Sequence, residues 1–185
     1  SISEDAERLV RELLRKNKEI RDRVEELVRR SNDKNRRVLE EVEKRLRDII
    51  RKLEDIERRV KSEEMKKLLE EVLKEAEDLV REVLKLNDDT LRESEELVKK
   101  AKEDNERSLE EIRELVERVE RRVKDNEEVL RRIRDLLRRV TEHVEKSKRD
   151  IEKLLRESRD HVRRSKEKIK RLLDEARERV ERSKK

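Results

Sequence analysis

Two histidines, His143 and His161, are the residues of this sequence with the most versatile chemistry. A histidine can bind a metal ion, transfer a proton or change its charge near neutral pH. The two lie one 18-residue repeat apart, about 27 Å along a helix, so they cannot share one metal ion. Neither has a cysteine or another histidine within one helical turn, so the spacing of zinc ligands is absent. We therefore expect no metal site, and we interpret both as polar residues at the edge of a core, with a pH-sensitive element as the alternative.

Other patterns that could support catalysis or binding are weak. Carboxylate pairs are frequent, but a chain with 52 acidic residues produces them by chance on solvated faces. The chain has no glycine, so it has no Gly-rich phosphate loop. Ser158, Asp160 and His161 are close in sequence, but Asp160 falls outside the apolar stripe, so a catalytic triad is not expected. We predict no enzyme activity and no cofactor.

The composition indicates long helices. Charged residues make up 59% of the 185 residues, and Gly, Pro, Cys, Phe, Trp and Tyr are absent. Without glycine and proline the chain has few residues for turns, so connections must be few and short. No aromatic residue is present to stack on bases, and we expect no nucleic-acid or membrane partner. No targeting signal is recognised, and the location of the protein is left unknown.

An 18-residue pattern is written twice between residues 141 and 176. His143, Val144 and Ile151 recur as His161, Val162 and Ile169. This repeat length is five turns at about 3.6 residues per turn, so each side chain returns to the same face of a straight α-helix. A seven-residue repeat would instead impose a left-handed supercoil. The pattern therefore predicts straight, nearly untwisted helices.

Two breaks in this apolar pattern divide the chain into three helices of nearly equal length. We expect them at about residues 3–60, 63–124 and 126–183, within one domain that covers residues 1–185. Residues 31–34 look like a loop by composition but do not disturb the apolar phase, so the first helix should continue through them. Similar sequences at residues 57–64 and 120–128 indicate two short turns. In the second, Asp125 and Glu128 have the spacing of a capping box. The fold class is all-α, an elongated antiparallel (up-down-up) three-helix bundle.

The charge of the three segments favours this arrangement. Residues 1–61 carry a net charge of +4, residues 62–125 of −7 and residues 126–185 of +8, which agree with the overall +5. The acidic middle segment attracts both neighbours. Because salt screens such long-range attraction, we expect it to steer helix pairing more than to stabilise the fold.

Polar residues interrupt the apolar stripes at levels that match across the helices. If the two turns fold the chain back on itself, Asn17 lies level with Asn105, and Asn35 with Asn87. Buried polar groups without partners cost roughly 1–3 kcal/mol each, so we predict that they meet in two hydrogen-bonded layers. The predicted members are Asn17, Ser31, Asn35, Asn87, Thr90, Ser94, Asn105, Ser108, Thr141, His143, Ser147, Ser158, His161 and Ser165. The alternative is that some Ser and Thr residues bond to carbonyls of their own helix.

Taken together, these features resemble those of de novo designed parametric three-helix bundles with buried hydrogen-bond networks. The resemblance rests on the 18-residue repeat, the similar sequences of the two turns, the Leu/Val/Ile stripes, the Glu/Lys/Arg faces and the Asn/Ser layers. It implies a structural scaffold without a natural biochemical function. The alternatives are a pH-responsive bundle that acts through His143 and His161, and a natural coiled-coil module of the spectrin or BAR type. We expect a monomer that requires no partner, with a homo-oligomer as the other possibility.

Overall fold

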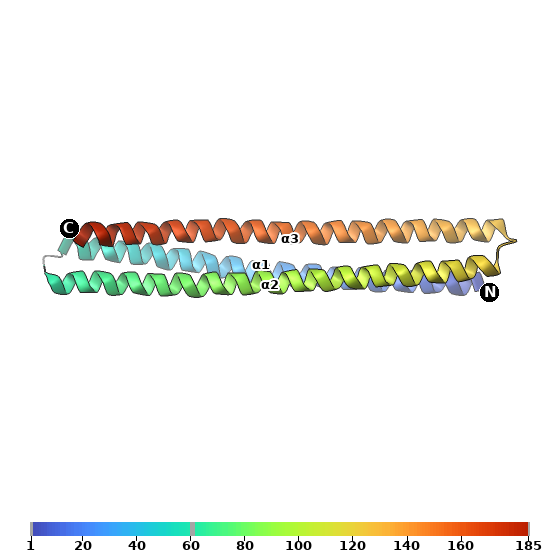
Figure 1. The fold of residues 1–185 in the computed structure, drawn as a ribbon, viewed down its shortest axis with the longest axis horizontal. Coiled ribbons are helices and arrows are strands. Elements are labelled where there is room, and N and C mark those ends of the chain that lie inside the picture. The colour runs from blue at the N-terminus through green and yellow to red at the C-terminus, as the bar shows by residue number, and fades with distance from the viewer. Residues whose placement is uncertain (1, 60–61, 185) are drawn as a thin grey trace. The chain divides into compact units, whose positions relative to one another are not determined.

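The computed structural model describes residues 2–59 and 62–184, and the protein is an all-α three-helix bundle (Figure 1). Helix α1 spans Ile2–Arg59, α2 spans Glu63–Arg122 and α3 spans Glu127–Lys184. No strand occurs within the described ranges. The predicted fold class is confirmed. Helix α1 continues through residues 31–34 without interruption, because the apolar phase outweighs the loop-like composition of that segment.

The helix ends carry the charges that the helix dipole favours. Acidic residues occupy the first turn of every helix, and basic residues occupy the last. Helix α2 is preceded by Ser62, whose carbonyl accepts a hydrogen bond from the Lys66 N–H at 3.3 Å. Val60 and Lys61, which belong to the predicted first turn, lie outside the described residues.

Asn126 caps the N-terminus of α3 after the second turn, one residue later than the sequence indicated. The Val129 N–H donates to Asn126 Oδ1 at 3.3 Å, and the Leu130 N–H donates to the Asn126 carbonyl at 3.1 Å. Asp125 therefore belongs to the turn, and the side chain of Asn126 satisfies a free amide of the first helical turn.

Contacts between residues group the chain into two compact units. Unit 1 contains the described residues of Ser1–Arg29 together with Ser94–Arg156, and unit 2 contains Arg30–Glu93 and the described residues of Glu157–Lys185. Each unit holds part of all three helices. The predicted single domain and the predicted absence of supercoiling stay predictions.

Unit 1 has two apolar clusters. Cluster A consists of Val10, Leu109, Ile112, Val116, Val119, Ile133, Val140 and Val144, with Leu13 and Leu14 among the residues at its edge. Cluster B consists of Val24, Val28, Val98, Ala101, Ile151, Leu154 and Leu155, with Ile20 at its edge. From cluster A to cluster B the residue numbers rise on α1, fall on α2 and rise on α3. The helices in this unit therefore run up, down and up.

Unit 2 has the same construction. Cluster C consists of Leu39, Val42, Leu46, Ala76, Val80, Val83, Ile169 and Leu173. Cluster D consists of Ile50, Leu53, Leu69, Val72, Ala176 and Val180. The numbers again rise, fall and rise along the three helices. Burial of these apolar side chains is the main source of stability in each unit.

Candidate functional site: the buried polar residues

A polar layer separates the two apolar clusters of unit 1. On α1, Asn17 follows Leu14 of cluster A and precedes Ile20 of cluster B. On α2, Asn105 lies between Ala101 of cluster B and Leu109 of cluster A. On α3, Ser147 lies between Val144 of cluster A and Ile151 of cluster B. All three helices thus place a polar residue at one level, and we call Asn17, Asn105, His143 and Ser147 the first polar layer.

A second polar layer borders cluster C in unit 2. Asn35 precedes Leu39 by four residues, Asn87 follows Val83 by four, and Ser165 precedes Ile169 by four. Each of these polar residues therefore lies one helical turn from the same apolar cluster, on its side away from cluster D. We call Asn35, Asn87, His161 and Ser165 the second polar layer.

The predicted polar residues divide equally by burial. Those with at most 6% of their surface exposed are Asn17, Asn35, Asn87, Ser94, Asn105, Ser147 and Ser158. Those that are half-buried are Ser31, Thr90, Ser108, Thr141, His143, His161 and Ser165. No predicted member is exposed. Asn87 and Ser147 are each 0% exposed, so the polar side chains reach as deep as the apolar ones.

Several polar atoms of the first layer are buried without a hydrogen-bond partner among the described residues. They are Asn17 Oδ1, Asn105 Nδ2, His143 Nε2 and Ser147 Oγ. An amide oxygen accepts, an amide nitrogen donates and a hydroxyl group does both, so the layer holds unpaired groups of both kinds. In the second layer the corresponding atoms are Asn87 Oδ1, Asn87 Nδ2 and His161 Nε2. Such atoms lower the stability of the folded state.

A hydrogen bond joins two uncharged polar side chains of different helices within unit 2. The Ser158 hydroxyl group donates to Asn32 Oδ1 at 2.9 Å, and so links α3 to α1. Asn32 is a residue that the sequence analysis missed. The signal was present, because Asn32 lies one repeat length after Leu14 and one repeat length before Ile50, both of which pack in apolar clusters.

Another polar side chain bonds to its own helix. The Thr141 hydroxyl group donates to the Leu137 carbonyl at 2.8 Å, which is the alternative that the sequence left open for Ser and Thr. Thr141 therefore forms a local bond, whereas Ser158 bonds across helices.

His143 is half-buried on α3 among cations. Burial lowers the pKa of His143 from its ordinary value of 6.5. Arg21, Lys18 and Lys146 lower the pKa further because they repel the positive charge of the protonated ring. Asp22 opposes this shift. The charges of Lys18, Arg21 and Asp22 come from α1, so the neutral form of the imidazole is favoured mainly by the desolvation of His143 and by the facing basic helix.

His161 has an environment of the same kind in unit 2. Its pKa is lowered by burial and by the positive charges of Arg36 and Arg164, and Glu40 opposes the shift. Arg36, Glu40 and Arg164 follow Lys18, Asp22 and Lys146 by one repeat length. The repeat therefore reproduces the charged surroundings of the histidine as well as the histidine itself.

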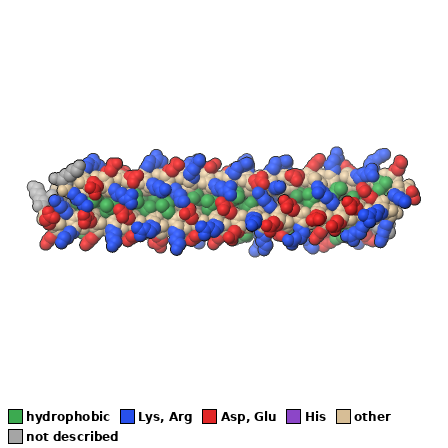
Figure 2. All heavy atoms as spheres, in the orientation of Figure 1, with side chains coloured by type: hydrophobic (Ala, Val, Ile, Leu, Met, Phe, Trp, Pro, Cys, Tyr) green, Lys and Arg blue, Asp and Glu red, His purple; other side chains and the backbone are tan. Residues whose placement is uncertain are grey.

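The outer surface carries ion pairs of both signs, and on the face in Figure 2 cationic and anionic side chains are interspersed. Lys184 Nζ lies 2.6 Å from a carboxylate oxygen of Glu70 on α2, and Arg179 Nη2 lies 2.8 Å from one of Glu54 on α1. The Lys184–Glu70 pair joins α3 to the acidic middle helix, as the segment charges predict, whereas the Arg179–Glu54 pair joins the two basic segments. Exposed pairs are screened by water and salt, so they add little stability.

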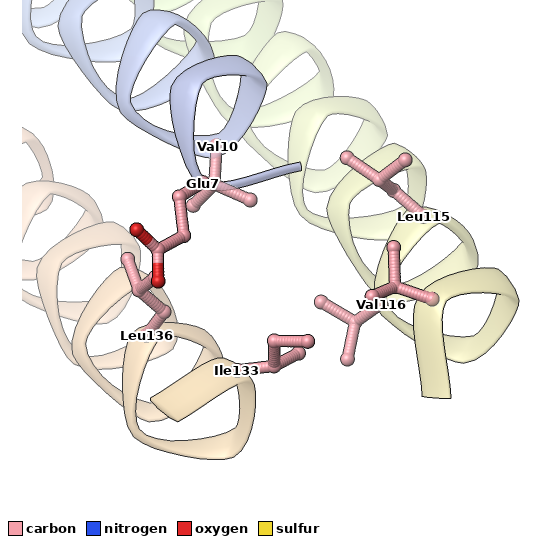
Figure 3. A pocket seen from close by; sticks show the side chains of 7 residues that line it. Glu7, Val10, Leu115, Val116, Ile133 and Leu136 are labelled. Atoms are coloured by element: carbon pink, nitrogen blue, oxygen red, sulfur yellow. The ribbon is translucent and has the colours of Figure 1, made fainter. Parts of the chain in front are cut away.

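An apolar cavity of about 10 Å³ lies in unit 1 (Figure 3). Residues that line it include Val10 of α1, Val116 of α2 and Ile133 of α3, and Glu7 lies beside Leu136 at its edge. This space is at the lower limit for admitting one water molecule, and a water molecule needs two to four polar partners. The cavity is therefore a packing gap and not a ligand site.

Across residues 2–59 and 62–184, no group of three or more His, Cys, Asp or Glu side chains is arranged to hold a metal ion. Among the helices of the described part, none is long and apolar enough to cross a membrane.

No protein-family model matches the sequence, and no curated protein is similar to it. A solved structure described as "Computationally designed three helix bundle" is similar to this chain, with 16% sequence identity and a TM-score of 0.42. The similarity covers 99% of this chain and 87% of that one.

Proposed function

We propose that this protein is a designed structural scaffold without a catalytic task, in which two polar layers fix how the helices pair. One observation carries the proposal: the first layer recurs as the second at one repeat length along every helix. The equivalent pairs are Asn17 and Asn35, Asn87 and Asn105, His143 and His161, and Ser147 and Ser165. This repeat length is an integral number of helical turns, so it is the repeat of a straight helix and is typical of a bundle designed from a regular geometry.

The polar layers select one register because a shifted register leaves amides against apolar side chains. In unit 1, a slip of one helical turn would move Asn105 of α2 toward the level of Ala101 or Leu109, inside an apolar cluster. Each stranded amide costs about 1–3 kcal/mol. Apolar stripes of Leu, Val and Ile alone tolerate such slips, because one aliphatic contact replaces another. The layers thus serve specificity, at a cost in stability.

The proposed scaffold is a monomer that needs no partner. Short turns bring consecutive helices together, and the charges of −7 on the middle segment against +4 and +8 on its neighbours favour pairing within one chain. Light scattering tests this directly. A mass of 22.8 kDa supports the proposal, whereas twice that mass would mean that the helices pair between chains.

The register role is tested by moving one amide along α2. The double substitution Ala101→Asn and Asn105→Ala keeps the composition but places the amide in cluster B. We expect a lower free energy of unfolding or a change of mass, because the amide moves from the level of Asn17 and Ser147 to a position among the apolar side chains of cluster B. The matched control exchanges Glu103 and Arg107, which are exposed and also four residues apart. A displaced variant that is as stable and as monomeric as the control would contradict the proposed role.

A further inference from the structure

The two histidines share a feature that the scaffold role does not need. In each, the Nε2 atom is buried and has no hydrogen-bond partner among the described residues, although the ring as a whole is half-buried. A polar layer that only fixes register is served by amides and hydroxyl groups. A histidine adds the ability to take up a proton between pH 5 and 8.

The charges around the two rings come from the two basic helices. On His143 they act from Lys18, Arg21 and Asp22 of α1 and from Lys146 of α3. Arg21 also lies 3.9 Å from Asp150 of α3. The described part of α2 contributes no charge to this set, and its residue at that level is the neutral Asn105.

On His161 the charges act from Arg36 and Glu40 of α1 and from Arg164 of α3. The residue of α2 at this level is the neutral Asn87. A groove of about 360 Å³ beside the ring is lined by residues that include His161, Arg36, Arg164 and Ser165. Lys168 and Glu43 also line it, but their charges pair with each other at 3.2 Å. Cations therefore outnumber carboxylates at both rings.

We propose that His143 and His161 are two copies of one proton-sensitive site, and that proton uptake at each weakens the folded state of the unit that contains it. A proton at Nε2 would place a positive charge at a buried atom that faces basic side chains and has no acceptor. Both the loss of hydration and the repulsion oppose this charge. The inference rests on the proposed role of the polar layers, because weakening a layer loosens the contacts that fix helix pairing.

The direction of the pH effect follows from the lowered pKa values. In the unfolded chain each imidazole has its ordinary pKa of 6.5, so below that pH the unfolded state binds more protons than the folded state. The stabilisation is fully present above pH 6.5 and is lost as the pH falls toward the folded-state pKa. For each unit that the pH falls in that window, protonation linked to one histidine lowers the folding equilibrium constant by up to about tenfold. The two histidines together lower it by up to about a hundredfold.

The first test measures the pKa of each imidazole in the folded parent protein by NMR titration, with assignment from single variants. We expect both below 6.5. Arg36→Gln should raise the pKa of His161 and leave that of His143 unchanged, because Arg36 acts on one ring only. A value at or above 6.5 for either ring overturns the proposal, and the spectrum of the parent alone shows this without assignment, because both imidazoles titrate in it.

The second test measures unfolding by guanidinium between pH 7 and pH 5. His143→Gln with His161→Gln keeps an amide at each site but removes the titrating group. The parent should lose stability across this range, and the double variant should not. Equal pH dependence in parent and variant overturns the proposal.

These outcomes are separate from those that test the scaffold role. If moving the Asn105 amide has no effect, the polar layers do not fix register, yet the imidazole pKa values still report on proton uptake. If the amide matters and the histidines titrate normally, the scaffold role stands and the proton-sensitive site is refuted.

Discussion

Replacement of Asn87 by leucine should stabilise the protein. Asn87 is 0% exposed, and neither its Oδ1 nor its Nδ2 has a hydrogen-bond partner in the described part of the chain. Burial of an unpaired amide costs about 1–3 kcal/mol by mutational measurements. Leucine has nearly the same size and shape, so Asn87→Leu removes this cost without opening a cavity. We expect the free energy of unfolding to rise by about 1–3 kcal/mol.

The structure also predicts the order of effects among equivalent substitutions. Asn105 has one unpaired buried amide atom, Nδ2, so Asn105→Leu should stabilise less than Asn87→Leu. Asn35 is 6% exposed and has no atom that is both buried and unpaired, so Asn35→Leu should stabilise least. Asn35→Leu is the matched control, because Asn35 and Asn87 belong to the same layer.

Guanidinium unfolding followed by circular dichroism measures all three variants. The slope against denaturant should stay constant, which would show that stability has changed and not the compactness of either state. A decrease of about 1 kcal/mol or more for Asn87→Leu would refute the reasoning, because it would mean that the amide is hydrogen-bonded in solution. The reverse order of the three variants would refute it as well.

Three further predictions concern the apolar core, a helix end and an ion pair. Leu46→Ala should lower the free energy of unfolding by about 2–5 kcal/mol, measured by guanidinium unfolding, because Leu46 is 1% exposed within cluster C and its truncation leaves a cavity. Asn126→Ala should lower the free energy of unfolding by about 0.5–2 kcal/mol in the same assay, because α3 loses its cap, and Asn126→Ser should retain most of the stability that the cap contributes. Glu152 has a lowered pKa because Lys102 Nζ donates to its carboxylate at 2.8 Å, so stability from this pair is present above pH 4.5 and is lost as the pH falls through the folded-state pKa. Lys102→Gln should raise the pKa of Glu152 in an NMR titration, and no change would show that the pair does not form in solution.

The fold was predictable because the apolar phase is long and regular. Residues 31–34 show the value of phase over composition, since α1 passes through a segment with the residue types of a loop. The levels of Asn17, Asn105 and Ser147 were also predictable, because a turn of known position and the constant rise per residue of an α-helix fix which residues face one another.

The hydrogen bonds of the polar residues could not be predicted in the same way. Whether a hydroxyl group bonds across helices, as Ser158 does, or to its own helix, as Thr141 does, depends on a side-chain torsion of small energy difference. The cap at Asn126 instead of Asp125 reflects a shift of one residue in the turn, which periodicity does not resolve. Asn32 could have been found, because the residues one repeat length before and after it are apolar.

The polar layers, as proposed above, select one pairing of the helices at a cost in stability. The most direct measurement compares the parent with a variant in which Asn17, Asn35, Asn87 and Asn105 are all leucine, by backbone-amide NMR spectra and light scattering. The parent should give one set of resonances and a mass of 22.8 kDa, and the variant should be more stable but give several sets of resonances or a mixture of masses. A variant that is as homogeneous as the parent would contradict the claim.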